Sequence, residues 1–158
     1  MKEEKENIQV VARNADLDFA ILKSSHPKSF IPPWNGRPDD LKVRDDLVLA
    51  SFRLGIGKNK LGFTMAFGMT VSTFKRCLIY SCPTYAGDSG AALVLRDGYL
   101  AGIHLETING LRELMDRKRI VKENLTDVEE AWDNIVSSGL AQGCCALFVN
   151  EFKKVISV

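Results

Sequence analysis

The sequence predicts a mainly β protein that carries a helical insertion and a C-terminal helix. Short segments rich in aliphatic, β-branched and aromatic residues recur over the first two thirds of the chain, and glycines or polar residues bound each of them. After residue 104 the apolar residues change to helical spacing. With 158 residues, the chain is long enough for one domain with a sizeable hydrophobic core.

Eight strands are expected, on either side of one long connection. The connection, residues 26–46, is rich in proline, glycine and charged residues, which is typical of a loop between structural units. Asp97 and Gly98 form a hairpin turn signal between the last two strands. The expected strands are residues 8–13, 19–23, 47–54, 62–67, 70–74, 76–81, 91–96 and 99–104.

The helical insertion is expected at about residues 111–139. Thr126 and Glu129 have the spacing of a capping box, and Gly139 ends the apolar stripe that follows. The stripe consists of Val128, Ala131, Trp132, Ile135 and Val136. Two interpretations stay open: a surface insertion, or a segment that covers a pocket or docks a partner. A C-terminal helix is predicted from the spacing of Phe148, Phe152, Val155 and Ile156.

The stretch from Gly87 to Gly90, with the sequence GDSG, has the composition of a nucleophilic serine site. A serine hydroxyl attacks a carbonyl carbon only where backbone N–H groups stabilise the developing oxyanion, and flanking glycines let the chain turn tightly enough to present them. The string resembles the nucleophile motif of chymotrypsin-like serine proteases. The resemblance implies Ser89 as the nucleophile and the N–H groups of Gly87 and Ser89 as the oxyanion hole. An ordinary β-turn is the alternative.

A second segment extends the resemblance. Asp18 precedes a short apolar run, which predicts a strand entered from a loop. The segment resembles the one that carries the catalytic aspartate in chymotrypsin-fold proteases, and Asp18 is the position that matches. Such a carboxylate is largely buried and holds the histidine of the triad in the right tautomer. Asp16 is the weaker candidate, because it lies nearer the loop.

The resemblance covers most of the chain and implies its domain organisation. Residues 1–25 are expected to be a remnant of a first β-barrel that carries the triad aspartate, and residues 26–46 to link the two barrels. Residues 47–158 are expected to form the second barrel, a chymotrypsin-like barrel of six antiparallel strands with the nucleophile, the insertion and the C-terminal helix.

The resemblance also points to a specificity pocket. Trypsin-type enzymes carry an acid six residues before the nucleophile, where this chain has Pro83, so cleavage after Arg or Lys is not expected. Thr84 and His104 match the positions that bind Glu or Gln side chains in glutamyl endopeptidases and picornavirus-type proteases, and Gly102 lies on the same expected strand. A hydroxyl and an imidazole N–H supply two directional donors. The alternative for His104 is a core histidine satisfied by the backbone.

One part of the triad is missing. The chain has two histidines, His26 and His104, and neither lies upstream of Asp18, where the resemblance implies the general base. His26 is expected to be exposed in a loop. Two hypotheses follow: a fragment of a Glu- or Gln-preferring serine endopeptidase whose histidine comes from an upstream segment or a second chain, or a catalytically inactive homologue that binds a peptide or protein.

Composition excludes several other classes. The net charge of +1, without a basic stripe, argues against a nucleic-acid or membrane-surface role, so a protein or peptide substrate is the expected partner. No signal peptide or membrane-spanning run is visible, which makes an intracellular, cytoplasmic location the default expectation. The four cysteines are expected as free thiols. No metal or cofactor is expected, because no cysteine pair has ligand-like spacing with a histidine.

Overall fold

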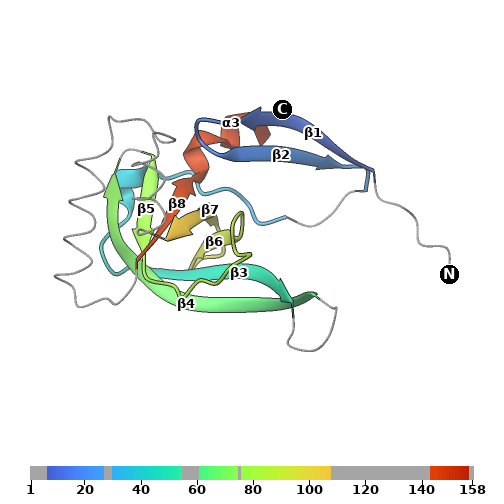
Figure 1. The fold of residues 1–158 in the computed structure, drawn as a ribbon. Helices are drawn as coiled ribbons and strands as arrows, with labels where there is room; N and C mark the ends of the chain where they lie inside the picture. The colour runs from blue at the N-terminus through green and yellow to red at the C-terminus, as the bar shows by residue number, and fades with distance from the viewer. Residues whose placement is uncertain (1–6, 27–29, 55–60, 75, 108–142, 157–158) are drawn as a thin grey trace.

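The computed structural model describes residues 7–26, 30–54, 61–74, 76–107 and 143–156. Six antiparallel strands form a closed barrel in the order β3-β4-β5-β8-β7-β6, and a separate two-stranded sheet pairs β1 with β2 (Figure 1). This confirms the predicted mainly β fold and six-stranded barrel. The strands are β1 Ile8–Asn14, β2 Phe19–Ser24, β3 Asp46–Leu54, β4 Leu61–Phe74, β5 Cys77–Tyr80, β6 Ala92–Leu95, β7 Leu100–Thr107 and β8 Cys144–Phe148.

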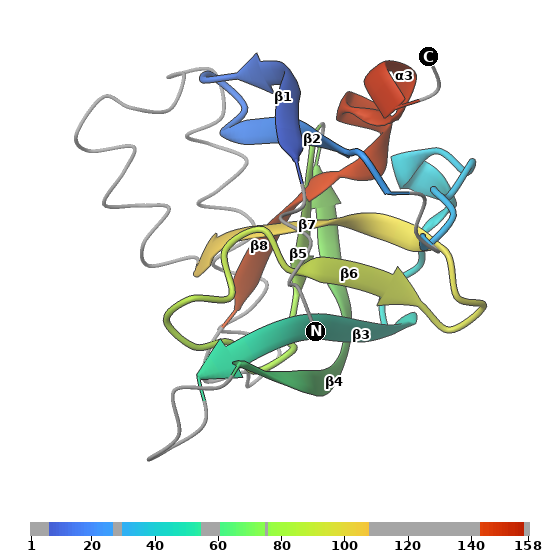
Figure 2. The ribbon, with the colours of Figure 1, turned by 90° about the vertical axis from the view of Figure 1, so that its right-hand side faces the viewer.

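The β1–β2 sheet lies on one side of the barrel and the β3–β4 pair lies on the other, as two perpendicular views agree (Figures 1 and 2). The connection between the two sheets contains a short 3-10 helix, η1 Pro38–Asp40, and one bridge from Pro33 to Leu100 of β7. Trp34 also donates its backbone N–H to the carbonyl of Leu100 at 2.9 Å. The connection is therefore fastened to the barrel.

Strand β4 corrects one prediction. Residues 62–67 and 70–74 were expected as two strands, but they form one strand that pairs with β3 and β5, with a register shift between Thr70 and Ser72. The reason lies at Gly68, where an added Cβ would lie 2.5 Å from the backbone nitrogen of Cys82. The glycine permits a close approach of two backbones, and it does not end the strand.

Strand β8 corrects a second prediction. Phe148 was expected in a C-terminal helix, but it ends a strand whose five residues are all buried between β5 and β7. A continuous apolar run carries no alternation, so its period does not separate a buried strand from a helix. The helical part begins after it, as a 3-10 turn, η3 Val149–Glu151, and a short helix, α3 Lys153–Ile156.

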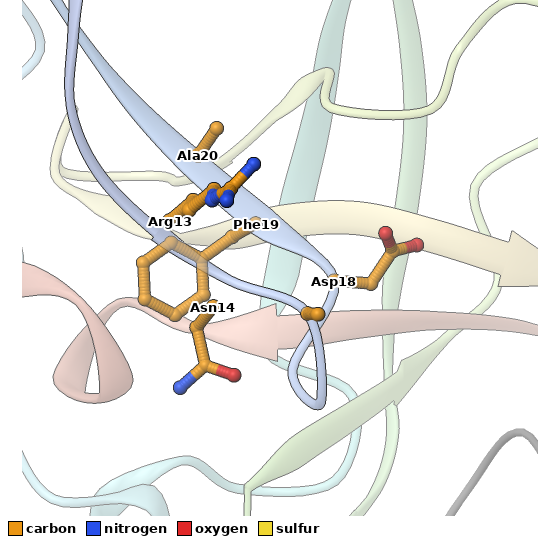
Figure 3. A pocket seen from close by; sticks show the side chains of 6 residues that line it. Arg13, Asn14, Asp18, Phe19 and Ala20 are labelled. Atoms are coloured by element: carbon orange, nitrogen blue, oxygen red, sulfur yellow. The ribbon is translucent and has the colours of Figure 1, made fainter.

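The β1–β2 hairpin packs one face on the end of the barrel. Leu17, Phe19 and Ile21 contact the cluster formed by Leu147, Val149 and Phe152, and the rings of Phe19 and Phe152 lie 5.8 Å apart. The turn between the two strands forms an open pocket (Figure 3). The pocket is lined by Arg13, Asn14, Ala15, Asp18, Phe19 and Ala20.

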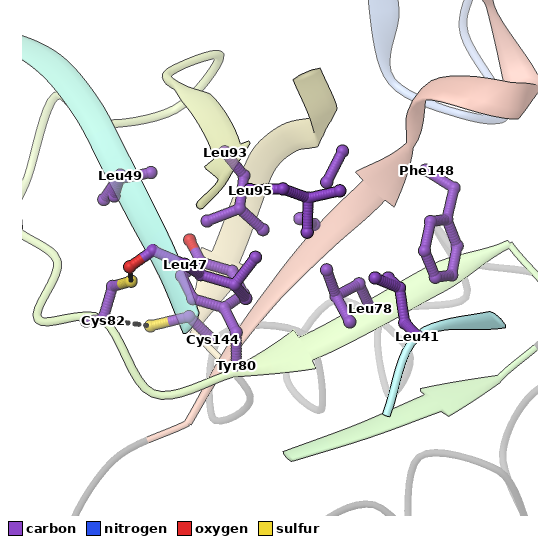
Figure 4. Packing of buried hydrophobic residues seen from close by; sticks show 12 residues of the cluster. Leu41, Leu47, Leu49, Leu78, Tyr80, Cys82, Leu93, Leu95, Cys144 and Phe148 are labelled. Atoms are coloured by element: carbon purple, nitrogen blue, oxygen red, sulfur yellow. Dashed lines mark hydrogen bonds between the residues drawn. The ribbon is translucent and has the colours of Figure 1, made fainter. Parts of the chain in front are cut away.

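The barrel interior is filled by one hydrophobic cluster (Figure 4). Its buried members come from β3, β5, β6, β7 and β8 and from the segments beside them, and Ala66 of β4 packs against them. Fully buried members include Leu47, Leu49, Leu78, Tyr80, Leu93 and Phe148.

The helical insertion predicted at about residues 111–139 lies outside the described residues. No helix in the described part of the chain is long and apolar enough to span a membrane.

Candidate active site

The predicted nucleophile lies in a turn between β5 and β6. Ser89 is exposed there, between Gly87 and Gly90, whose φ angles are +99° and +82°. L-residues with a side chain rarely adopt such angles, so both positions require glycine. Two backbone hydrogen bonds fasten the turn to β7. The N–H of Gly90 donates to the carbonyl of His104 at 2.8 Å, and the N–H of His104 donates to the carbonyl of Ala91 at 2.9 Å.

The two backbone donors expected to form an oxyanion hole are available. Asp88, between them, donates its N–H to the carbonyl of Tyr85 at 3.1 Å. In contrast, no hydrogen bond among the described residues uses the N–H of Gly87 or of Ser89, and both residues are exposed. Backbone N–H groups without a protein acceptor are the kind of donor that can stabilise an anionic oxygen.

The hydroxyl of Ser89 donates to a backbone group. Its Oγ lies 3.4 Å from the carbonyl oxygen of Leu105 in β7. This is the one side-chain hydrogen bond that Ser89 makes with the part of the chain that the structure describes. The structure therefore places no histidine of the described residues at hydrogen-bond distance from the Ser89 hydroxyl.

Asp88 is a site residue whose role the sequence analysis missed. Its carboxylate is completely buried and accepts hydrogen bonds from Ser51 Oγ (2.7 Å), Arg53 Nε (3.0 Å), Arg53 Nη2 (2.7 Å) and the backbone N–H of Tyr85 (2.8 Å). Burial alone would raise the pKa of Asp88, but the hydrogen bonds from Arg53, Ser51 and Tyr85 outweigh it and lower the pKa to about 2. Asp88 is therefore ionised at neutral pH.

The sequence of β3 contains a signal for the ion pair between Arg53 and Asp88. Leu47, Leu49 and Ser51 alternate on the buried face of the strand, and Arg53 continues the same alternation. An arginine at an inward position of a strand needs an anionic partner, since unpaired charges are almost never buried. The partner, Asp88, is 35 residues away, and one sequence alone gives no means of choosing it among the acids of the chain.

His104 is nearly completely buried at 4% exposure and has a specific partner. Its Nδ1 lies 2.7 Å from the hydroxyl of Tyr80, and the two rings meet edge to face. Burial lowers the pKa of His104, although the negative charges of Asp88 and Glu106 act in the opposite direction. Burial also raises the pKa of Tyr80 far above its ordinary value. The pair is therefore a neutral imidazole and a neutral phenol.

Thr84 has a partner of its own. Its Oγ1 lies 3.2 Å from the sulfur of Cys144, and that thiol in turn donates to the carbonyl of Cys82 at 3.7 Å (Figure 4). Thr84 and His104 were expected to act together on one substrate side chain. In the structure, Thr84 contacts Cys144 and His104 contacts Tyr80, so each of the two residues has a different neighbour.

Gly102 has a structural reason to be glycine. It is buried in β7 and pairs with both Leu93 of β6 and Phe148 of β8. A Cβ at this position would lie 2.3 Å from the carbonyl oxygen of Leu147. Close approach of β7 and β8 therefore excludes a larger residue, whatever part Gly102 takes in substrate binding.

Asp18 lies at the end of the β1–β2 turn, directly before β2, as the sequence predicted. Its φ angle is +53° and its side chain is exposed, at the open pocket of that turn (Figure 3). The burial that the resemblance implied for a triad carboxylate is absent at this described residue. His26 is exposed in a bend, as expected, with Nδ1 3.2 Å from Ser25 Oγ.

The cysteines and acids of the described residues supply no metal site. No group of three or more His, Cys, Asp or Glu side chains in that part of the chain is arranged to hold a metal ion. All four cysteines are free thiols.

Comparison with known proteins identifies the family. The family model of the trypsin-like peptidase domain matches residues 2–103, about two thirds of the chain. The match runs from the segment before β1 into β7, and it includes Asp18, Gly87 and Ser89. No curated protein matches the sequence. The closed six-stranded antiparallel barrel fits the chymotrypsin-like fold of such peptidases. This barrel, its glycine-bounded serine turn and the family match together show that the chain belongs to the trypsin-like peptidase domain family.

Proposed function

We propose that the chain carries the nucleophile and specificity side of a chymotrypsin-type serine endopeptidase site. The observation that supports this most is the turn at Ser89, where an exposed hydroxyl lies beside two backbone N–H groups that have no acceptor among the described residues. A turn that served only to connect β5 and β6 would not require this arrangement.

In the proposed reaction, Ser89 Oγ attacks the carbonyl carbon of the scissile peptide bond and gives its proton to a histidine. The N–H groups of Gly87 and Ser89 stabilise the oxyanion of the tetrahedral intermediate. The same histidine then protonates the leaving amine, and water hydrolyses the acyl-enzyme. We place the histidine in an upstream segment or a second chain, and we assign Asp18 to orient it. Ser89 must first exchange its hydrogen bond to Leu105 for one to that histidine.

The preferred substrate has Gln, and secondarily Glu, before the scissile bond. We assign the protonated hydroxyl of Tyr80 as the donor to Nδ1 of His104, which leaves the proton of the neutral imidazole on Nε2; the 2.7 Å distance between the two atoms suits this assignment. An uncharged N–H donor suits the oxygen of an uncharged amide, because a carboxylate is stabilised more by a positive partner. The hydroxyl of Thr84 supplies the second donor once a substrate displaces its contact with Cys144.

The test uses the full-length protein encoded by the transcript that contains these 158 residues. Peptides with Gln, Glu, Arg or Phe before the scissile bond are compared at about pH 7.5, beside a Ser89→Ala control. We expect cleavage after Gln and, more slowly, after Glu, and we expect the control to lose at least about 1,000-fold in kcat. Cleavage after Arg or Phe alone would contradict the specificity. Cleavage that survives in the control would contradict Ser89 as the nucleophile.

A second function, a peptide-binding module without catalysis, is favoured by one observation. The Ser89 hydroxyl is bonded to a backbone carbonyl, and His104 is buried against Tyr80, so neither is arranged for proton transfer to the other. Calorimetric titration of the 158-residue Ser89→Ala variant with a Gln-containing peptide tests this function. Binding that is lost in Thr84→Val, with no cleavage by the full-length protein, would establish it in place of the first.

A further inference from the structure

Strands β3, β4 and β6 carry apolar side chains on the face that points away from the barrel core. Inward residues such as Leu47, Leu49 and Leu93 fill the core, so the residues between them point outward. This face lies on the side of the barrel opposite the β1–β2 sheet (Figure 1). Five large outward side chains of β3 and β4, which we call the stripe, are 41–69% exposed: Phe52, Phe63, Met65, Phe67 and Met69.

The face has a raised row beside a shallow trough. The raised row, here called the ridge, consists of the outward residues of β4, Phe63, Met65, Phe67 and Met69. Beside it, β3 and β6 present smaller, half-buried outward residues that form the trough, Val48, Ala50, Ala92 and Val94. Ala50 pairs with Met65 of β4 on one side and with Ala92 of β6 on the other. Long side chains therefore stand beside a lane of short ones.

Charge does not oppose contact between two such faces. Among the described outward side chains of these three strands, the charged ones are Asp46 and Arg96, and they pair with each other at 3.6 Å. The whole chain has a net charge of +1, so two copies repel each other only weakly. Phenylalanine and methionine are also residue types that protein interfaces favour over the rest of a protein surface.

The area of the face suits a protein partner. At about 150–250 Å² for a large side chain, the exposed fractions of the stripe amount to an apolar area on the order of 600 Å². Monomeric proteins rarely expose a larger apolar patch than this. A standard interface takes about 800 Å² from each partner, and the stripe with the trough supplies most of that area.

We propose that a second copy of the chain covers this face, related to the first by a twofold axis that runs along the strands. A second copy is favoured because one face supplies both the ridge and the trough that the ridge fills. The axis places the ridge of each copy over the trough of the other, so every contact occurs twice. At one end, Phe52 and Phe63, whose rings lie 5.5 Å apart, meet the same two rings of the second copy.

The two barrels then pack sheet against sheet, about 10 Å apart, as the two sheets of a β-sandwich do. This inference goes beyond the proposed function and does not depend on it, because association of the chain requires neither substrate nor catalysis.

The first test measures the oligomeric state of the 158-residue chain by analytical ultracentrifugation, from about 1 µM to about 1 mM. We expect a monomer–dimer equilibrium, because a face that pairs with itself closes after two copies. Phe67→Lys, at a ridge residue 69% exposed, is expected to raise the dissociation constant at least about 10-fold. Phe30→Lys is the matched control, because Phe30 is 80% exposed and lies outside the three strands. It should leave the dissociation constant unchanged.

A second variant tests the trough. Ala50→Arg places a long side chain where the ridge of the other copy is expected, so it should also raise the dissociation constant at least about 10-fold. Circular dichroism shows whether each variant is folded, and Met65→Thr replaces Phe67→Lys if that variant is not.

The third test measures the relative placement of the two copies. Ala50→Cys protein is mixed with Met65→Cys protein, because the twofold axis places these two positions opposite each other. Copper–phenanthroline then oxidises the two thiols, which lose two electrons and two protons, to a disulfide between the chains. We expect mass spectrometry of the digest to find this bond, and to find none when Phe30→Cys protein replaces Ala50→Cys protein.

Three results would overturn the proposal. The first is a monomer at every concentration. The second is a dimer that keeps its wild-type dissociation constant in folded ridge variants, which would place the contact on another face. The third is a dimer that the ridge variant weakens but Ala50→Arg does not, with no disulfide between positions 50 and 65. That result would exclude the packing of the ridge over the trough.

Discussion

His104 shows how the surroundings of a residue decide its chemistry. The same histidine in water would be partly protonated near neutral pH, but its burial against Tyr80 lowers its pKa and keeps it neutral. The ring is held in place, with Nδ1 2.7 Å from the Tyr80 hydroxyl. The residue that we assign to recognition is therefore prepared before any substrate binds.

The lowered pKa of His104 predicts a pH-dependent stability. Below the ordinary histidine pKa of about 6.5, the unfolded chain binds a proton at this residue and the folded chain does not, so the free energy of unfolding falls as the pH falls, by at most about 1.4 kcal/mol per pH unit. The loss stops once pH drops below the folded pKa. Denaturant unfolding between about pH 7.5 and pH 5 measures this slope.

Histidine substitutions separate this effect from other titrations. His104→Gln is expected to remove the slope, and His26→Gln, at the other histidine of the chain, is the matched control. An equal slope in wild type and in His104→Gln would contradict a neutral, buried His104. The negative groups near His104, Asp88 and Glu106, stay in place in both variants.

The roles of individual residues could be predicted from the sequence only where a short, contiguous motif contains the residues that act together. The turn at Ser89 and its glycines were predictable, since positive φ angles and free N–H groups follow from a compact glycine-rich motif. The buried pair of Asp88 and Arg53 was not, because it joins residues 35 positions apart. Likewise, no local signal paired His104 with Tyr80, which lies on a different strand. The catalytic assignments of Asp18 and Ser89 stay predictions.

At the scale of elements, strands β7 and β8 are unusually close at one point. Gly102→Ala would place a methyl group 2.3 Å from the carbonyl oxygen of Leu147, so the backbone must shift. We expect a loss of about 1–3 kcal/mol in the free energy of unfolding. Gly62→Ala in β4 is the matched control, because its added carbon would lie 3.8 Å from the nearest atom, the carbonyl oxygen of Arg53. Chemical denaturation of both variants measures the difference; equal losses would contradict the close approach.

Elements were predictable where alternation or turn residues marked them. The hairpin at Asp97 and Gly98 formed as expected, with Gly98 at φ +87° between β6 and β7. The predictions of β4 and β8 were wrong, because the physical reasons for these two strands are not visible in a local sequence pattern. Gly68 serves a close approach to Cys82 in the neighbouring segment after β5, and β8 is buried on both faces and therefore shows no period.

At the scale of the whole molecule, two outer surfaces of the described chain are apolar. The outer face of β1–β2 exposes Ile8, Val10 and Leu22. That this hairpin is a remnant of a first barrel stays a prediction. On the other side of the barrel, β3 and β4 expose a second stripe (Figures 1 and 2). The stripe consists of Phe52, Phe63, Met65, Phe67 and Met69. Contiguous apolar surface of this kind favours association.

Replacement of phenylalanine by threonine, at one exposed and one buried position, compares the roles of the surface stripe and of the hydrophobic core. Phe67→Thr, at a residue 69% exposed, is expected to change the free energy of unfolding by less than about 1 kcal/mol and to reduce concentration-dependent association. Phe148→Thr, at a fully buried residue, is expected to cost about 3–5 kcal/mol. Denaturant unfolding and sedimentation of both variants measure the two effects. Unchanged association in Phe67→Thr would show that the stripe does not cause it.

The two hydrogen bonds between the nucleophile turn and β7 have a consequence for how such a protein diverges. The backbone of His104 both accepts from the N–H of Gly90 and donates to the carbonyl of Ala91, so two hydrogen bonds join the strand residue assigned to selecting a substrate to the turn assigned to chemistry. A substitution that displaces the strand at position 104 also displaces Ser89. New specificity is therefore reached more easily through side chains outside the strand, such as Thr84, than through the strand itself, and protein engineering should begin there.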